Sequence, residues 1–260
     1  MIILLSPAKS MKEDRTTALP LSEPRMRADT DGLVKIAEGL TARDIKDLMK
    51  VSDDIATLNV SRFTAFEEQP EHPAGLLFDG DVYWGLDAQS LDEDGMRAAD
   101  DRIRILSGLY GYLRPLDRIR PYRLEMGTKL ANPRGKTLYH YWGSSIAEAI
   151  DADMEEREGP VLNLASNEYF KAVDRKALKS PVITAKFLNV KDGEARNLGF
   201  FAKRARGQLA RFAVDNRLDR AEGAKDFNYD GYAFDKAASS ETEYVFSRTQ
   251  PPPAGSVTPG

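Results

Sequence analysis

Short apolar runs that stop at polar or turn-forming residues recur along this chain. Residues 1–5 are apolar throughout and are followed by a Ser-Pro pair, which is typical of a buried strand starting at the N-terminus. Residues 161–164, 181–190 and 244–246 form similar runs, and β-branched side chains are frequent in the second of these. We therefore predict a strand at each of the four places.

Other stretches combine strand and turn signals. Residues 76–86 alternate apolar side chains around a central Asp-Gly-Asp sequence, which predicts a strand, a turn and a second extended piece. The Asp-Gly pair at 192–193 is a hairpin turn signal, and residues 198–202 are expected to form a returning strand. Residues 102–106 alternate as a half-buried strand or the end of a helix does.

Helical signals lie between these strands. A Ser or Thr followed three residues later by an acid, as in a capping box, occurs at 41–44 and 90–93 ahead of helical spacing. Residues 139–150 have the apolar spacing of an amphipathic helix. The chain has no internal repeat and no clear linker, so we predict a single α/β domain over residues 1–250. The Pro-rich tail, 251–260, is predicted to be disordered.

Composition narrows the chemistry. The chain has 260 residues, of which 42% are hydrophobic, enough to bury a sizeable core. It contains no cysteine and only two histidines, which excludes disulfides, a catalytic thiol and a tetrahedral His/Cys zinc site within one chain. Carboxylates can still hold a hard cation, and Asp79 and Asp81 are the pair that could approach one, but two acids around a turn glycine are more often turn residues, so we expect no metal and no cofactor. The first apolar run is far too short to span a bilayer, so we expect no membrane partner and a cytoplasmic location.

Basic residues gather in two segments of a chain whose net charge is −4. Residues 102–136 hold nine basic and two acidic residues, and residues 171–217 hold twelve basic and four acidic residues. A surplus of this size indicates a phosphate-binding surface, although charge runs are also found on solvated faces where they pair with nearby acids. The candidate DNA- and phosphate-binding residues join cations to glycines that expose backbone amides and to a stacking tyrosine: Gly108, Tyr110, Gly111, Arg114, Arg118, Arg120, Lys203, Arg204 and Arg206.

Polar side chains follow two of the predicted strands. Ligands in open α/β sheets collect at the carboxyl ends of strands, which favours a site there. An ordinary loop at Lys9, a helix N-cap at Ser166 or Asn167, and a structural Arg123–Glu125 pair explain the same residues without a site. The candidates for an enzyme site are Lys9, Tyr122, Arg123, Glu125, Asn163, Ser166, Asn167 and Glu168.

Five motifs together resemble a known family. They are SPAK near the N-terminus, FDGDVYWGLD, LSGLYGYLRPLDRIRPYRLEMG, NLASNEYFKAV and AKRARGQLARF. In this length and order they are similar to the YaaA family of peroxide-stress proteins over nearly the whole chain. The resemblance implies a mixed α/β domain with a central mixed sheet and a positively charged cleft. It also implies a helix-hairpin-helix-like element, which would fall at residues 106–113 with Gly108 and Gly111 at its turn. These glycines are three apart, whereas the usual hairpin places them two apart.

The resemblance further implies a bacterial protein of hydrogen peroxide resistance whose loss raises free iron and oxidative DNA damage. Some relatives look like enzymes that modify deazaguanine bases in DNA. Two functions follow, of which the first, with a role in limiting iron-dependent oxidative DNA damage, is our prediction and the second is its alternative. One is non-specific DNA binding through phosphate contacts in a basic cleft. The other is an enzyme that takes a nucleobase-like ligand or nucleotide in a pocket beside that cleft.

Overall fold

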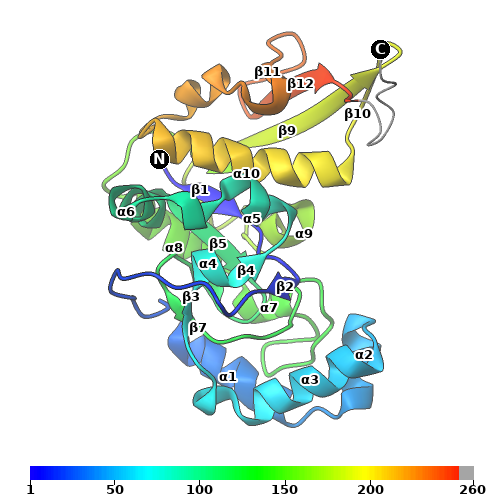
Figure 1. Cartoon of the computed structure of the whole chain (residues 1–260). Coiled ribbons are helices and arrows are strands. Elements are labelled where there is room, and N and C mark those ends of the chain that lie inside the picture. Colours follow the sequence, from blue (N-terminus) through cyan, green and yellow to red (C-terminus); the bar gives the residue numbers. More distant parts are fainter. Residues whose placement is uncertain (252–260) are drawn as a thin grey trace.

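The centre of the fold is a mixed eight-stranded sheet with the strand order β11-β12-β9-β8-β1-β5-β6, in which β10 also pairs with β9 (Figure 1). The computed structural model describes residues 1–251. The sheet consists of β1 (Ile3–Leu5), β5 (Ile103–Ser107), β6 (Gly111–Leu113), β8 (Val161–Asn163), β9 (Val182–Lys191), β10 (Glu194–Arg196), β11 (Ala233–Phe234) and β12 (Glu243–Thr249). Five neighbouring strands of the sheet are mutually parallel: β5, β1, β8, β9 and β12. The strands β6, β10 and β11 pair antiparallel with their neighbours.

Strand β1 lies in the middle of the sheet between β5 and β8. All of its residues are fully buried, because a parallel strand covered on both faces needs apolar side chains on both sides. This explains why the N-terminal run is continuous and does not alternate. The strands predicted from the four apolar runs are confirmed, and the Asp-Gly pair at 192–193 forms the turn between β9 and β10.

Three helices, α1 (Arg27–Glu38), α2 (Ala42–Met49) and α3 (Asp53–Thr64), gather at the end of the molecule away from β11 and β12 (Figure 1). Thr41 caps α2 through a full capping box with Asp44, as its spacing predicts. The remaining α-helices are α4 (Ala74–Leu77), α5 (Asp81–Leu86), α6 (Glu93–Arg102), α7 (Leu138–Trp142), α8 (Ser145–Met154), α9 (Asn167–Phe170) and α10 (Gly199–Asp215). Short two-stranded pairings join β2 (Ser10–Met11) to β4 (Phe78–Asp79) and β3 (His72–Pro73) to β7 (Arg118–Ile119).

The long helix α10 packs against α5, α6 and β9. Its contact with α5 is close because a glycine stands on each helix at the crossing point. A Cβ on Gly207 would lie 1.8 Å from the carbonyl oxygen of Val82, and a Cβ on Gly85 would lie 2.1 Å from that of Arg204. Only hydrogen fits at both positions, so the two helices are locked together at backbone distance.

Several expectations are corrected by the structure. Residues 198–202 lie almost entirely in α10, because packing on α5 and β9 outweighs the strand preference of their aromatic side chains. Residues 76–86 contain two short helices around β4 in place of two extended pieces. The helix expected at 139–150 is divided into α7 and α8 at Gly143, whose φ of +48° is left-handed.

The expected helix-hairpin-helix-like element at residues 106–113 is instead a β-hairpin. Strands β5 and β6 flank the turn and pair antiparallel, with Ser107 opposite Gly111. All eight residues of this segment are buried, and eight residues are too few to form two helices and a turn.

The fold class is confirmed as a mixed α/β structure in a single compact domain, with one hydrophobic core that includes side chains from the first to the last strand. Nothing between residues 1 and 251 forms a helix that is both long and apolar enough to cross a membrane. Apart from Pro251, the tail predicted at 251–260 lies outside the described residues.

Candidate functional site

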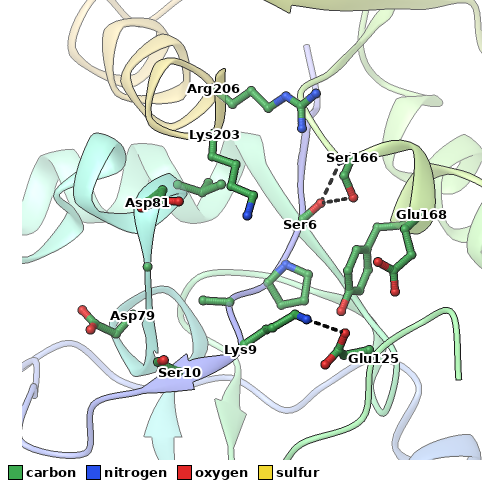
Figure 2. Close-up of a pocket in the computed structure, with 15 residues that line it drawn as sticks. Ser6, Lys9, Ser10, Asp79, Asp81, Glu125, Ser166, Glu168, Lys203 and Arg206 are labelled. Atoms are coloured by element: carbon green, nitrogen blue, oxygen red, sulfur yellow. Dashed lines mark hydrogen bonds and ion pairs between the residues drawn. The ribbon is translucent and has the colours of Figure 1, made fainter. Parts of the chain in front are cut away.

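A pocket with a volume of about 270 Å³ opens at the carboxyl ends of β1 and β8 (Figure 2). Its wall is made by the loop after β1, the turn between β4 and α5, the loop that carries Glu125, the start of α9, and the exposed side of α10. Segments far apart in the chain meet here because β1 and β8 are adjacent parallel strands and end at the same edge of the sheet.

Four of the eight residues predicted for an enzyme site line this pocket: Lys9, Glu125, Ser166 and Glu168. Lys9 Nζ lies 3.0 Å from Glu125 Oε2 across the pocket, and the Lys9 side chain is 67% exposed. Arg123 supports the pair from behind by donating to Glu125 Oε1 at 2.8 and 3.0 Å. Burial raises the pKa of Glu125, but the Lys9 ammonium and the Arg123 guanidinium outweigh it and hold that pKa below its ordinary value. Glu125 is therefore an ionised acceptor fixed in place.

Two serines join the ends of β1 and β8. The Ser6 hydroxyl accepts from the backbone N–H of Ser166 at 2.9 Å and donates to the Ser166 hydroxyl at 3.2 Å. Ser166 occupies the N-cap position of α9, but its side chain makes no capping bond. The expectation that Ser166 serves as a helix cap is therefore wrong, and its hydroxyl faces the pocket beside Ser6 (Figure 2).

Glu168 is the second carboxylate on this side of the pocket. Its Oε1 accepts from the backbone N–H of Gly127 at 2.9 Å. The bond ties α9 to the loop that follows Glu125 and leaves Oε2 of Glu168 without a hydrogen-bond partner among the described residues. Two carboxylates and one ammonium thus share one end of the pocket (Figure 2).

The opposite side of the pocket is formed by α10 and the start of α5. Lys203 and Arg206 point from α10 into the cavity (Figure 2). Asp81 lines the cavity from α5, whereas the neighbouring Asp79 accepts from Arg15 and from the Trp84 indole. Within residues 1–251, no three His, Cys, Asp or Glu side chains are arranged to hold a metal ion.

The other predicted enzyme residues lie outside the cavity. Asn163 is buried and uses its amide to bond Thr184 and the backbone N–H of Ala165. Tyr122 is buried against the Ser107 hydroxyl, and desolvation raises the pKa of its phenol. Asn167 lines a neighbouring groove on the far side of α9. Asn163 and Tyr122 therefore shape the protein around the pocket without reaching a ligand in it.

The two glycines of the first basic segment pack against other residues of the protein and do not lie on an open surface. A Cβ on Gly108 would lie 2.2 Å from the Leu124 carbonyl oxygen, and one on Gly111, where φ is +69°, would meet Met26 and Trp142. Tyr110 is buried, and its hydroxyl accepts from the backbone N–H of Arg120 at 2.9 Å. In this arrangement none of the three presents a surface to a nucleic acid.

Three arginines of the same segment are paired with carboxylates, and for two of them the acids come from earlier in the chain. Arg120 contacts Glu67 and Glu71, each at 3.1 Å, and Arg118 lies 3.2 Å from Glu23. Arg114 contacts Asp117 at 3.4 Å. The local surplus of positive charge is thus largely balanced by distant acids. Arg204 of the second segment is half-exposed and lies 4.0 Å from Asp230.

Ser6 and Asp81 are pocket residues that are not among the candidates predicted for the enzyme site. Ser6 directly follows β1, so the strand-end argument that selects Lys9 applies to it equally. Asp81 lies in the Asp-Gly-Asp sequence whose predicted turn is in fact the start of α5. Lys203 and Arg206 were selected as phosphate contacts on a DNA surface, and the structure brings them into the pocket.

The fold and the site define an α/β protein with a pocket, lined in part by charged and hydroxyl side chains, at the carboxyl ends of its parallel strands. The family model for the peroxide stress protein YaaA matches residues 1–238, and the chain belongs to this family. It is 49% identical over 257 residues to a UPF0246 protein of Phenylobacterium zucineum, covering 97% of both chains. It is also 49% identical over 255 residues to a UPF0246 protein of Caulobacter vibrioides, covering 96% of this chain and all of the relative.

Proposed function

We propose that this peroxide-stress family member is an enzyme that acts on a nucleobase or nucleotide held in the pocket between β1, β8 and α10. One observation carries the proposal. Lys9, Glu125, Ser166 and Glu168 come from three separate segments of the chain and line a single cavity. Polar groups that converge in a cavity at the carboxyl ends of parallel strands are the usual composition of a ligand site in an α/β fold.

The residues supply acid–base chemistry. Glu125 is kept ionised by Lys9 and Arg123, so it accepts hydrogen bonds from a ligand and holds the lysine in position. Glu168 has one carboxylate oxygen without a partner among the described residues and is the group we assign as general base or acid. Lys9, exposed at the rim, donates to an electron-rich ring atom or oxygen.

The size of the cavity limits the ligand. A volume of about 270 Å³ is at the lower end of the range for small-molecule sites and excludes a double helix. A base within DNA therefore has to leave the stack, or be single-stranded, before it enters. This requirement favours single-stranded over duplex substrates.

The test is binding and turnover with wild-type protein and pocket variants. Nucleosides and a single-stranded oligonucleotide are titrated by calorimetry, and the incubated DNA is digested and examined by mass spectrometry for altered bases. Glu168→Gln is expected to abolish any base conversion while retaining binding, and Ser166→Ala to weaken binding. Glu194→Gln, an equal charge change at an exposed residue of β10, is the control. Wild-type protein that binds none of these ligands would refute the proposal.

A second candidate function is non-specific DNA binding that helps to limit iron-dependent oxidative DNA damage. It is favoured by a groove on the far side of α9 in which cationic side chains lie over aromatic rings. Lys171 Nζ lies 5.1 Å from the centre of the Tyr139 ring, and Arg175 Cζ lies 5.6 Å from that of Phe170. Among the described residues neither cation has a carboxylate within 4 Å, in contrast to Arg118 and Arg120. We therefore propose that a DNA strand follows this groove toward the pocket.

The DNA hypothesis is tested by fluorescence anisotropy with a single-stranded oligonucleotide over a series from about 50 to 200 mM salt. Binding is expected to weaken steeply with salt. Lys171→Gln combined with Arg175→Gln should reduce the salt slope by roughly one for each phosphate contact removed. Arg118→Gln with Arg120→Gln is the matched double variant. If this second pair removes the slope and the first does not, the groove is not the DNA track.

A further inference from the structure

Arg206 differs from the other arginines of the described residues because it is partly buried and yet has no carboxylate partner. Its guanidinium points into the pocket, with no carboxylate within 4.0 Å and no hydrogen bond to any of the described residues, and its Nε is buried (Figure 2). By contrast, Arg211 on the same helix contacts Asp215 at 2.9 Å. Burial lowers the pKa of Arg206. A partly buried cation without a counter-charge lowers the stability of the folded protein, so its presence needs a reason.

Lys203 adds a second cation on the same face of α10, three residues before Arg206. Its ammonium also points into the cavity and has no ion pair among the described residues (Figure 2). Residues three apart on a helix are neighbours on one face. The α10 wall of the pocket therefore presents two positive groups side by side.

The serine pair provides a hydroxyl donor facing these cations. Ser166 accepts from Ser6 at 3.2 Å, and this leaves the hydroxyl hydrogen of Ser166 free to donate into the pocket. Of the four carboxylates that line the rest of the cavity, two are paired with cations and two are not. Glu125 is paired with Lys9, and Asp79 with Arg15, whereas Asp81 and Glu168 lack ion pairs among the described residues. The cavity thus has two cations on α10, the Asp81 carboxylate beside them on α5, and the Glu168 carboxylate at its opposite end.

We infer that the α10 wall is a phosphate subsite, in which Arg206, Lys203 and the Ser166 hydroxyl bind the phosphate group of a nucleotide. A planar guanidinium binds two phosphate oxygens at once, and an ammonium and a hydroxyl satisfy the remaining oxygens. A phosphate with up to two negative charges compensates both cations, whereas a carboxylate compensates only one. The base then extends toward Glu168 and the Lys9–Glu125 pair.

The assignment of a nucleobase to this ligand rests on the proposed function, whereas the assignment of a phosphate to the α10 wall does not. Lys203 and Arg206 are thereby assigned to the ligand in the pocket and not to the outer DNA surface. The phosphate has two sources, a free 5′-mononucleotide or an internal phosphate beside a base flipped out of a DNA strand.

The test compares phosphate-bearing and phosphate-free probes by calorimetry at constant ionic strength. The probes are inorganic phosphate, the four 5′-deoxymononucleotides, their nucleosides, and an oligonucleotide without terminal phosphate. Wild-type protein is expected to bind at least one mononucleotide roughly 10-fold or more tightly than its nucleoside, because charge-assisted hydrogen bonds are the strong ones. Arg206→Gln should remove that preference, and Lys203→Gln should reduce it. Arg196→Gln, the same charge change at an exposed residue of β10, should leave it intact.

The outcomes separate the two proposals. An Arg206-dependent affinity for the oligonucleotide identifies an internal phosphate as the source, and affinity for mononucleotides alone identifies the free nucleotide. If phosphate binds with this dependence while nucleosides and base identity make no difference, the subsite stands and the nucleobase function falls. If inorganic phosphate and mononucleotides bind no better than nucleosides, or if Arg206→Gln leaves the preference unchanged, the subsite is refuted.

Discussion

The contact between α5 and α10 supports the cationic wall of the pocket, and Gly207→Ala tests it directly. The added methyl group would lie 1.8 Å from the Val82 carbonyl oxygen and 2.7 Å from the Leu86 nitrogen. Both are backbone atoms, so no side chain can turn aside. Restoring a separation of 3.0 Å to Val82 requires the helices to move apart by about 1.2 Å.

The stability change has two opposing parts. Overpacking costs about 1–3 kcal/mol, with the upper end expected where the obstruction is backbone. Replacing glycine by alanine inside a helix returns about 1 kcal/mol through propensity. A net loss of about 2 kcal/mol corresponds to a fall in Tm of roughly 4–8 °C for a domain of this size. The separation of the helices also moves Lys203 and Arg206, so phosphate affinity should fall.

Gly199→Ala is the control, because it lies on the same helix and a Cβ there has no neighbour within 4 Å. The measurement is thermal unfolding of both variants in phosphate-free buffer, followed by calorimetric titration with phosphate. Gly199→Ala should match or exceed the wild type in Tm. A Gly207→Ala protein as stable as the Gly199→Ala protein would contradict the close contact between the helices.

Three further predictions concern charged groups. Arg206→Met should raise the unfolding free energy in phosphate-free buffer by about 1 kcal/mol, because it removes a partly buried charge that has no carboxylate partner among the described residues, and a fall in Tm would contradict this. The pKa of Glu125 is lowered in the folded protein, so its ion pairs stabilise the fold above the ordinary pKa of the carboxyl group. This stabilisation is lost as the pH falls through the folded-state pKa. In denaturant titrations, the stability advantage of the wild type over Glu125→Gln should therefore shrink between about pH 6 and pH 3. Asp153→Asn breaks a buried pair with Arg104 and should cost about 3–5 kcal/mol in chemical unfolding, whereas Asp31→Asn, at an exposed pair, should cost less than about 1 kcal/mol.

The strand-end argument predicted part of the site because it depends on local pattern and on one rule of sheet topology. The apolar runs at 1–5 and 161–164 are buried strands, and the residues after them had to lie at a sheet edge. Lys9, Ser166 and Glu168 are in the pocket because β1 and β8 are neighbours in the sheet. No sequence pattern shows that β1 and β8 are neighbours, so only the strand order of the folded sheet places these residues in one cavity.

Net charge summed along a sequence segment was the poorest predictor of a binding surface. The surplus in residues 102–136 indicated a phosphate surface, but Arg118 and Arg120 are balanced by Glu23, Glu67 and Glu71. These acids lie roughly 50 to 100 residues earlier in the chain, and summing charge along a segment cannot detect them. The glycines at 108 and 111 were likewise recognised as close approaches, although the approaching groups are the protein's own.

The sequence by itself determined the buried strands, the helix cap at Thr41, the hairpin turn at 192–193 and the family, because each depends on residues close together in the chain or on motifs in order. Only the tertiary structure decided which charges are compensated. Pairing depends on which side chains lie within a few ångströms of one another, and folding brings distant acids to Arg118 and Arg120 but none of the described ones to Arg206.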